Sequence, residues 1–452
     1  MANFAETFQN IFKIPELKSR ILFTLMILLV VRIGAHISVP GVDLDLIMNA
    51  DPAASSDEGL FGFFDIFVGG ALSNAAIFAL GIMPYITATI IFQLAGIVMP
   101  QIQKMQREGE EGRRKLNQYS RLLTVAIGLL QSIAIAIKIG STEIQNQNIV
   151  PNPDFMFYVT AVVLMTAGVI FMMWLGEQIT EKGIGNGISL IIFIGIIAAL
   201  PSAAIAEYKS RFVSDAPFLQ SLFIELIIIG ILIVIIALVI LITQGARRIP
   251  VQYAKRQVGR KVYGGQTNYI PLRVNTAGVM PIIFAQALIF IPQTLAGFFP
   301  DSEAMRNFAG YFAYDSAVYA IVFFFMVVFF TYFYTAIIFN PKDIADNMKK
   351  QGGFIPGVRP GAPTKEYIDR ILTRITLPGS IFLGLVAILP SILPMFIPIN
   401  PYFAPFFGGT SLLIIIGVAL DTLQQIESHL MMRHYDGFMK TGKIRGRVGA
   451  NI

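Results

Sequence analysis

The chain has 452 residues and a formal net charge of +6, with 55% apolar and only 14% charged residues. Soluble domains carry about a quarter charged residues, so this composition excludes an ordinary water-soluble protein. Because cysteine is absent, disulfides, thiolate catalysis and cysteine metal sites are excluded as well. Several apolar runs of about 20 residues can each cross roughly 30 Å of hydrocarbon as a helix. The chain is therefore predicted to be a polytopic helical membrane protein.

Residues 1–20 form an amphipathic segment that contains acids as well as bases. They lack the basic region, apolar core and cleavage site of a secretory signal peptide. We expect this segment to lie on the cytoplasmic membrane surface and the first span, from Ile21, to remain in the mature protein. A second cytoplasmic segment, the tail, is expected over residues 431–452.

Ten membrane spans are predicted between these two ends. They lie at about 21–38, 75–99, 121–140, 154–176, 184–203, 218–243, 275–296, 314–339, 371–397 and 407–430. With a cytoplasmic N-terminus, 29 of the 34 lysine and arginine residues lie in cytoplasmic segments. This asymmetry satisfies the positive-inside rule and predicts that both termini are cytoplasmic.

Arg32 falls within the first predicted span. It could belong to an ion or proton site, or its long side chain could extend from the outer end of the helix to lipid headgroups. Glu225 is the one acid at a matching depth. Because a single pair is too little for a proton relay, the sequence favours the headgroup interpretation.

Residues 59–74 are apolar but short, and Gly69 and Gly70 interrupt them. They lie on the outer side, directly before the second span. The segment could fold back and close a funnel, or it could form an interfacial helix on the outer leaflet. The residues alone do not separate these two possibilities.

Two similar hexapeptides stand in the second and seventh spans. GIMPYI occupies residues 81–86 and GVMPII occupies residues 278–283, and a weaker match links 185–192 with 408–415. Both matches are offset by five spans, which predicts inverted five-helix halves over 21–205 and 206–430, with a functional site at their interface. A chance coincidence of glycine and proline is the alternative.

The matched segments contribute a set of isoleucines: Ile82, Ile86, Ile188, Ile192, Ile283 and Ile414. These side chains cannot bind an ion or a polar solute. Arranged as a ring, they would form an apolar constriction that excludes water and ions by dewetting. Ordinary lipid-facing or core isoleucines are the alternative interpretation.

Two cytoplasmic loops, 244–273 and 340–370, are longer than a simple connection requires. The first holds seven basic residues and no acid, with strand-like alternation near Val251 and Val262. In the second, glycine and proline at 357–361 predict a turn that presents Arg359 outward. Such loops indicate electrostatic docking of acidic lipid, RNA or an acidic protein, although positive-inside topology could account for the charge alone.

No enzyme motif is evident, because the phosphate-binding loop and the HExxH metal motif are missing and His36, His429 and His434 are not clustered. We therefore expect no enzymatic activity, no cofactor and no metal site. No energy source is encoded either, so a driven process would need a partner.

Long stretches of the chain resemble the SecY family, the large subunit of the bacterial protein-conducting channel. They include FALGIMPYITATIIFQL (78–94), WLGEQITEKGIGNGISLIIF (174–193), YAKRQVGR (253–260), NTAGVMPIIFA (275–285), FNPKDIADNMKKQGGFIPGVRPG (339–361) and FGGTSLLIIIGVALD (407–421). The resemblance implies an all-α fold of ten transmembrane helices in two inverted halves around a central pore. It also implies a cell inner (plasma) membrane protein that translocates unfolded polypeptides and releases transmembrane segments laterally into lipid.

The same resemblance assigns roles to individual positions. The six isoleucines would form the pore ring, and the plug near 59–74 would include Phe61, Phe64, Ile66, Phe67, Gly69 and Gly70. Spans 2–3 and 7–8 would form the lateral gate, with Thr89, Gln93, Gln131 and Asn275 at its seam. Lys255, Arg256 and Arg359 would dock cytoplasmic partners.

The partners implied are small membrane subunits of the SecE and SecG type, a SecA-type translocation ATPase, the ribosome, clients with signal sequences, and the lipid bilayer. Two other function classes are less well supported. A secondary transporter predicts intramembrane acids or a polar midplane pocket, where this sequence has isoleucines. A scaffold that docks RNA or ribosomes leaves the repeat unexplained.

Overall fold

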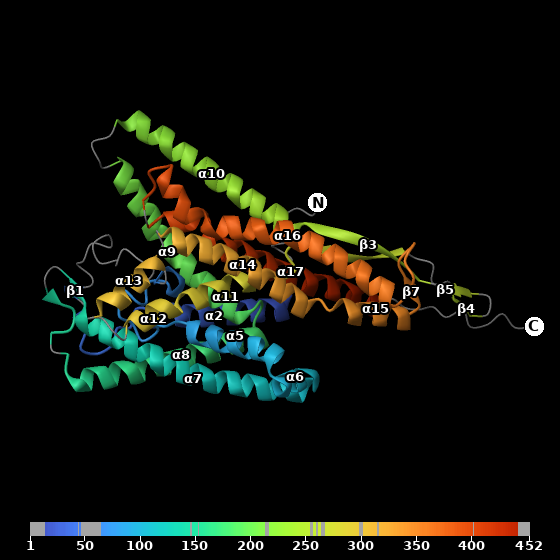
Figure 1. The fold of residues 1–452 in the computed structure, drawn as a ribbon, viewed down its shortest axis with the longest axis horizontal. Coiled ribbons are helices and arrows are strands. Elements are labelled where there is room, and N and C mark those ends of the chain that lie inside the picture. The colour runs from blue at the N-terminus through green and yellow to red at the C-terminus, as the bar shows by residue number, and fades with distance from the viewer. Residues whose placement is uncertain are drawn as a thin grey trace, which may run out of the picture.

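The computed structural model describes residues 14–43, 45–46, 65–144, 147–151, 153–212, 217–253, 256–258, 261–263, 267–297, 302–313, 316–400 and 402–441. Long helices run side by side along the long axis of the molecule (Figure 1). Strands β3, β4, β5 and β7 lie at one end, and the β1 hairpin lies at the other (Figure 1). The fold class predicted from the sequence, a helical membrane protein, is confirmed.

The helices of the first half are α2 (Pro15–Gly34), α5 (Met83–Val98), α6 (Pro100–Arg107), α7 (Glu110–Ser141), α8 (Phe155–Lys182) and α9 (Gly187–Phe212). A two-stranded hairpin, β1 (Glu143–Ile144) and β2 (Gln147–Asn148), joins α7 to α8. Helix α9 continues past the predicted boundary between the halves at 205. Residues 1–13 of the predicted N-terminal segment lie outside the described residues.

The second half contains α10 (Phe218–Gln244), α11 (Met280–Ile289), α12 (Ile291–Gly297), α13 (Glu303–Tyr311), α14 (Ala317–Ile338), α15 (Pro341–Lys350), α16 (Ala362–Ile392) and α17 (Gly409–Thr441). Each of the ten predicted spans overlaps a helix. Among the described residues, seven helices are long and apolar enough to cross a membrane. Helices α5 and α6 are apolar and long enough only when taken together, and they are bent by 104° at their junction, as in a broken span or a re-entrant loop.

Two spans begin later than predicted because their first residues are not helical. The second span was expected from 75 and the seventh from 275, yet helix starts only at Met83 and Met280. Gly81 and Gly278 just before these starts have φ of +55° and +63°, a left-handed conformation that an α-helix does not tolerate. Proline near the first helical position then favours the new start.

The two long loops that were predicted to be cytoplasmic, 244–273 and 340–370, form one folded unit. Strands β3 (Ala246–Tyr253) and β6 (Thr267–Arg273) pair antiparallel from Ala246↔Arg273 to Gln252↔Thr267, and β4 (Arg256–Val258) pairs with β5 (Lys261–Tyr263). The second loop adds β7 (Gly353–Phe354) to the edge of β3. Buried Ile249, Leu272 and Ile368 from both loops pack in one cluster. The strand-like alternation predicted for the first loop is confirmed.

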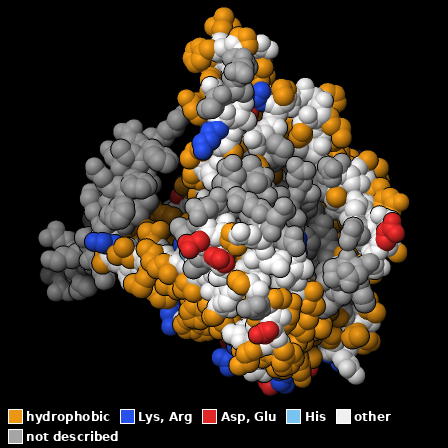
Figure 2. Space-filling model, turned by 90° about the vertical axis from the view of Figure 1, so that its left-hand side faces the viewer, with side chains coloured by type: hydrophobic (Ala, Val, Ile, Leu, Met, Phe, Trp, Pro, Cys, Tyr) orange, Lys and Arg blue, Asp and Glu red, His pale blue; other side chains and the backbone are white. Residues whose placement is uncertain are grey.

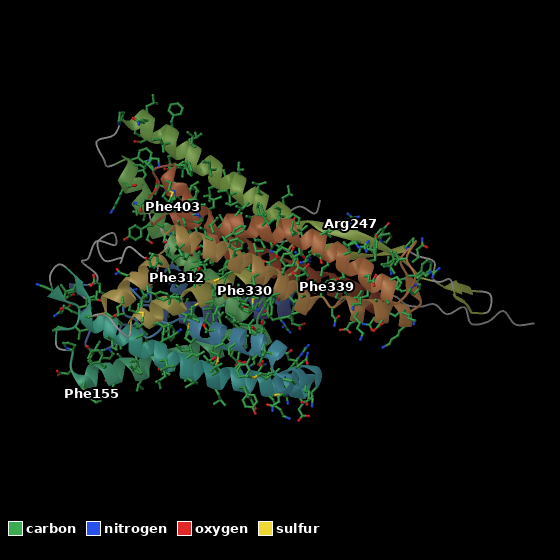
Figure 3. The ribbon with its side chains drawn as sticks, in the orientation of Figure 1. Phe155, Arg247, Phe312, Phe330, Phe339 and Phe403 are labelled. Atoms are coloured by element: carbon green, nitrogen blue, oxygen red, sulfur yellow. The ribbon has the colours of Figure 1, made fainter. Side chains whose placement is uncertain are left out.

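The largest apolar cluster takes residues from both halves, whereas the outward faces of the helices are also apolar. Phe155 and Phe218 are 83% and 69% exposed. Apolar side chains cover much of the end of the molecule seen in Figure 2. Phe155, Phe312 and Phe403 lie toward this end, whereas Arg247 lies toward the strands (Figure 3). An exposed surface this apolar is suited to lipid rather than water.

Candidate functional site

The two hexapeptides adopt the same backbone conformation. After Gly81, the carbonyl of Ile82 accepts bonds from the amides of Tyr85 and Ile86 at 3.1 and 3.2 Å. After Gly278, the carbonyl of Val279 accepts bonds from the amides of Ile282 and Ile283 at 3.2 and 3.3 Å. The local sequence therefore repeats both the left-handed glycine and the first helical turn, and it positions Ile86 and Ile283 equivalently.

The structure brings the six predicted ring isoleucines into one apolar cluster: Ile82, Ile86, Ile188, Ile192, Ile283 and Ile414. Five of them are buried, and Ile188 is partly buried. They come from α9, α11, α17, α5 and the turn before α5, and so from both halves. Ile82 and Ile188 both approach Gly176 on α8, where a side chain would meet them at 3.3 and 3.5 Å. Their role as a pore ring stays a prediction.

The described part of the predicted plug packs against the same cluster. Phe67 is 5% exposed and belongs to the cluster, and Ile66 packs on it. Gly69 and Gly70 have φ of +70° and +84°, so the chain turns sharply after a short helical turn at 65–68. This packing places residues 65–74 inside the bundle rather than along the outer leaflet. Phe61 and Phe64 lie outside the described residues.

The turn after Gly70 is closed by Asp65. Its carboxylate accepts bonds from the amides of Leu72 and Ser73 at 2.7 and 3.1 Å. Burial raises the pKa of the Asp65 carboxyl, although the two amide donors act in the opposite direction. The carboxylate therefore organises the segment locally, as an acceptor for its own backbone.

The interpretation that Arg32 extends to lipid headgroups is wrong. Its Nη1 donates to the carbonyl oxygen of Gly69 at 2.7 Å, in the interior of the bundle. Glu225 interacts electrostatically with Glu207 and Arg211 instead. The position of Arg32 along its span does not show on which face of α2 the side chain lies, so the sequence alone could not predict that it points inward.

The predicted lateral gate residues lie on several helices. Gln93 on α5 has a buried Oε1 without a hydrogen-bond partner among the described residues, and Thr89 donates to the carbonyl of Tyr85 within α5. Gln131 on α7 is 6% exposed, and its Oε1 has no hydrogen-bond partner among the described residues. Asn275 instead lines a cavity of about 170 Å³ with Arg273, Asp421 and Gln424.

Gln286 on α11 was not predicted. It is 1% exposed, and neither polar atom of its amide has a partner within the described part of the chain. Helix α11 contacts α5, and α12 contacts α7, so Gln286 belongs to the helices of the predicted gate. Its signal in the sequence is a glutamine within the apolar run of α11, three residues after Ile283.

A different set of contacts joins the halves at α9. The amide of Gly185, just before α9, donates to Gln425 Oε1 on α17 at 2.9 Å. Near the other end of α9, Glu207 accepts the amide of Asn400 at 2.7 Å and pairs with Arg211 at 2.9 Å. The Glu207 side chain is only 2% exposed. None of these residues was singled out from the sequence.

The predicted docking residues are only partly described. Arg359 is exposed on the turn after β7, and its carbonyl accepts the hydroxyl of Thr364 at 2.8 Å. Gly357 in this turn has φ of +82°. Arg256 begins β4, but its side chain and all of Lys255 lie outside the described residues. Arg247 and Arg248 on β3 are also exposed. Within the described residues, no group of three His, Cys, Asp or Glu side chains could hold a metal ion.

Structural comparison finds protein-conducting channels. The chain is similar to one reported as "The structure of a protein conducting channel", with a TM-score of 0.65, 16% identity and coverage of 94% of this chain and 95% of that one. A SecY protein whose plug domain is described as stabilising the closed state matches with a TM-score of 0.61, and so does Sec61 in a canine ribosome–channel complex. Each of these two is 16% identical and covers 94% of this chain and 95% of its own. At this identity the likeness shows the fold.

Sequence comparison gives the family. The SecY family model matches residues 76–423. Protein translocase subunit SecY of Streptomyces galbus is 45% identical, covering 96% of this chain and 99% of its own. The corresponding subunit of Thermotoga maritima is 43% identical, covering 98% and 99%. The chain belongs to the SecY family.

Proposed function

We propose that this chain is the central subunit of a protein-conducting channel, which moves unfolded polypeptides across the membrane and releases transmembrane segments sideways into lipid. One observation carries the proposal: isoleucines from two inverted halves meet in a single closed apolar cluster, and the plug packs on it. The names of its relatives, protein translocase subunits, support the same function.

An apolar constriction suits this task because it needs no chemistry. Isoleucine side chains can change rotamer and fit around many polypeptides without preferring one. When no client is present, the ring excludes water and ions by dewetting. Phe67 and Val68 of the plug line a small cavity with Ile82 and Ile192, so the plug would add a second barrier. The structural neighbour with a described plug domain is also said to maintain a membrane seal.

Lateral release would pass between α5 and α7 on one side and α11, α12 and α14, the helices of spans 7 and 8, on the other. Buried amides without partners cost free energy, so glutamines make this closed seam less stable than an apolar seam of the same shape. An apolar client segment has a better solvent in lipid than in an aqueous funnel. It would therefore leave through the seam once the halves separate.

The cytoplasmic unit of β3, β6 and β7 would dock the partners that supply energy. Its exposed Arg247, Arg248 and Arg359 favour acidic surfaces such as ribosomal RNA. Two structural neighbours, canine Sec61 and yeast Ssh1, are described in complexes with ribosomes. The family resemblance adds a SecA-type ATPase and small subunits of the SecE and SecG type. We place the protein in the plasma membrane with both termini cytoplasmic, and we assign it no enzymatic activity.

Ion conductance in planar bilayers tests the proposal, with the purified protein and its small partner subunits. Wild type is compared with a variant lacking residues 60–74 and with the pair Ile86→Gly and Ile283→Gly. We expect a sealed wild type and leaky variants. The pair Ile227→Gly and Ile233→Gly, which alters exposed isoleucines of α10, serves as a matched control and should stay sealed. Sealed ring and plug variants would contradict the proposed pore.

A further inference from the structure

Arg32 lies on the last turn of α2, a helix whose other face is apolar and outward. Leu25, Leu29 and Ile33 of α2 are 56%, 59% and 55% exposed. The guanidinium of Arg32 points the other way, into a cavity that Phe67, Ile82 and Ile192 also line. The positively charged guanidinium of Arg32 therefore lies beside the predicted ring and plug, among the apolar side chains of Phe67, Ile82 and Ile192.

The hydrogen bond from Arg32 to Gly69 explains how this cation is tolerated. A partly buried charge is costly unless it is hydrogen-bonded, and bonds from a charged donor are stronger than neutral ones. The Gly69 carbonyl accepts from Nη1 at 2.7 Å. This carbonyl is available because Gly69, with φ of +70°, reverses the chain after residues 65–68.

The turn at residues 67–69 packs on its opposite side against α9. A side chain at Gly195 would overlap the carbonyl oxygen of Phe67 and approach the amide of Gly69 at 3.3 Å. A side chain at Gly69 would in turn lie 2.9 Å from the Cα of Gly195. Residues 67–69 are thus held between a glycine of α9 and the arginine of α2.

The following residues are attached differently, through the chain just after α2. Ser38 Oγ donates to the carbonyl of Asn74 at 2.8 Å, Val39 donates to the carbonyl of Ala75 at 2.9 Å, and Ile77 donates to the carbonyl of Ile37 at 2.9 Å. These bonds fix residues 74–77. Releasing the Arg32 bond would therefore free the turn at Gly69 while its base stays attached.

We propose that Arg32 is the latch of the plug: its guanidinium holds the closed plug at the Gly69 carbonyl, and Gly195 is the seat against which the plug closes. Arg32 is a positioning residue of the seal. This inference rests on the proposed function of residues 65–74 as a plug. It assigns an intramembrane arginine to gating rather than to ion or proton transport.

The first test is ion conductance of Arg32→Met, which keeps an unbranched side chain but removes every donor. We expect Arg32→Met to leak, approaching the variant that lacks residues 60–74. Arg20→Met is the matched control, since Arg20 is an exposed arginine of the same helix paired with Glu16 at 3.8 Å, and it should stay sealed. A sealed Arg32→Met would overturn the latch.

Combining Arg32→Met with the deletion separates a latch from an effect on the pore itself. A latch acts only through the plug, so the double variant should conduct no more than the deletion alone. Additional conductance, or a changed ion selectivity, would mean that the charge acts on the pore and would reject the latch.

Amide hydrogen exchange provides a second measurement that does not depend on conductance. Loss of a charge-assisted bond should raise exchange at Gly69–Ser73 roughly tenfold or more, with α14 amides unchanged as the check on folding. Unchanged exchange at Gly69–Ser73 would refute the latch. If the deletion variant proved sealed while this exchange rose, the plug function would fail and the contact would stand.

Discussion

The two halves meet along two seams that are built in opposite ways. At the first, the hinge seam, two hydrogen bonds join the halves. The amide of Gly185, just before α9, donates to Gln425 on α17, and Glu207 on α9 accepts the amide of Asn400. At the gate seam, α5 and α7 face α11 and α12, where Gln131 and Gln286 carry buried polar atoms that find no partner among the described residues. The difference indicates which seam can open.

The physical basis is the low dielectric of the interior. There a satisfied polar contact is strengthened, and an unsatisfied one is costly. Separating the hinge seam would break these bonds and leave the buried Glu207 carboxylate without its Asn400 donor. Separating the gate seam would instead give its glutamines access to water or to a client backbone. The halves would therefore pivot about α9 and part at α5 and α11.

The largest expected effect comes from breaking the hinge seam at Glu207. Replacing Glu207 with alanine removes a buried carboxylate that accepts the Asn400 amide and pairs with Arg211, and breaking such a buried pair costs about 3–5 kcal/mol of stability. Thermal unfolding in detergent should show a clear decrease in Tm. Glu181→Ala, at an exposed acid of α8, is the control and should change little. An equally small change for Glu207→Ala would mean that the pair does not hold this seam.

The gate seam should respond in the opposite direction. Gln286→Leu removes two buried polar atoms without partners, so we expect the closed state to gain about 1–3 kcal/mol. Tm should rise, and translocation of a secretory client into proteoliposomes should slow.

Gln93→Leu is the matched comparison within this seam. It removes one buried polar atom without a partner among the described residues, where Gln286→Leu removes two, so its gain should be smaller than that of Gln286→Leu. A decrease in Tm for Gln286→Leu would show that the Gln286 amide has hydrogen-bond partners. The two seams would then no longer differ in how well their buried polar groups are bonded.

A smaller loss is expected at the Gly185 end of the hinge seam. Gln425→Ala removes the acceptor for the Gly185 amide, which should cost about 0.5–1.5 kcal/mol. Gln424→Ala, one residue earlier, is the control. It loses a hydrogen bond from Arg273 that lies within the second half, so it shows the loss of Tm that one such bond causes away from the seam. If the two variants have similar Tm values but only Gln425→Ala raises lateral release of a transmembrane client, the Gly185–Gln425 bond controls the pivot. If neither variant changes lateral release, this bond does not control the pivot.

The smallest effect is expected at Arg121. It makes two bonds to Glu177 at 2.9 and 2.8 Å, but the pair is exposed and lies between α7 and α8 of one half. Arg121→Ala should therefore change stability by about 0–1 kcal/mol and leave client release unaltered. A change in release would mean that rigidity within a half, as well as the seams, controls opening.

The sequence predicted the parts of the site that depend on local pattern. GIMPYI and GVMPII indicated equivalent backbone, and both glycines are left-handed with a helix starting two residues later. The isoleucines were found because they follow these glycines at the same spacing. Arg32 was interpreted wrongly, since its depth in α2 was known but its direction depends on where residues 67–69 pack.

What the sequence determined by itself was the set of apolar runs, the repeated hexapeptides and the spacing of the isoleucines within them, whereas the orientation in the membrane and the pore ring stay predictions. These follow from hydrophobicity, charge and helix-start chemistry, which act within a few residues. Only the tertiary structure decided which polar groups meet. Asn400 and Glu207 are 193 residues apart, and Gly185 and Gln425 are 240 apart. Such partners are selected by the packing of whole helices, because a hydrogen bond requires two groups within about 3 Å whatever their separation along the chain.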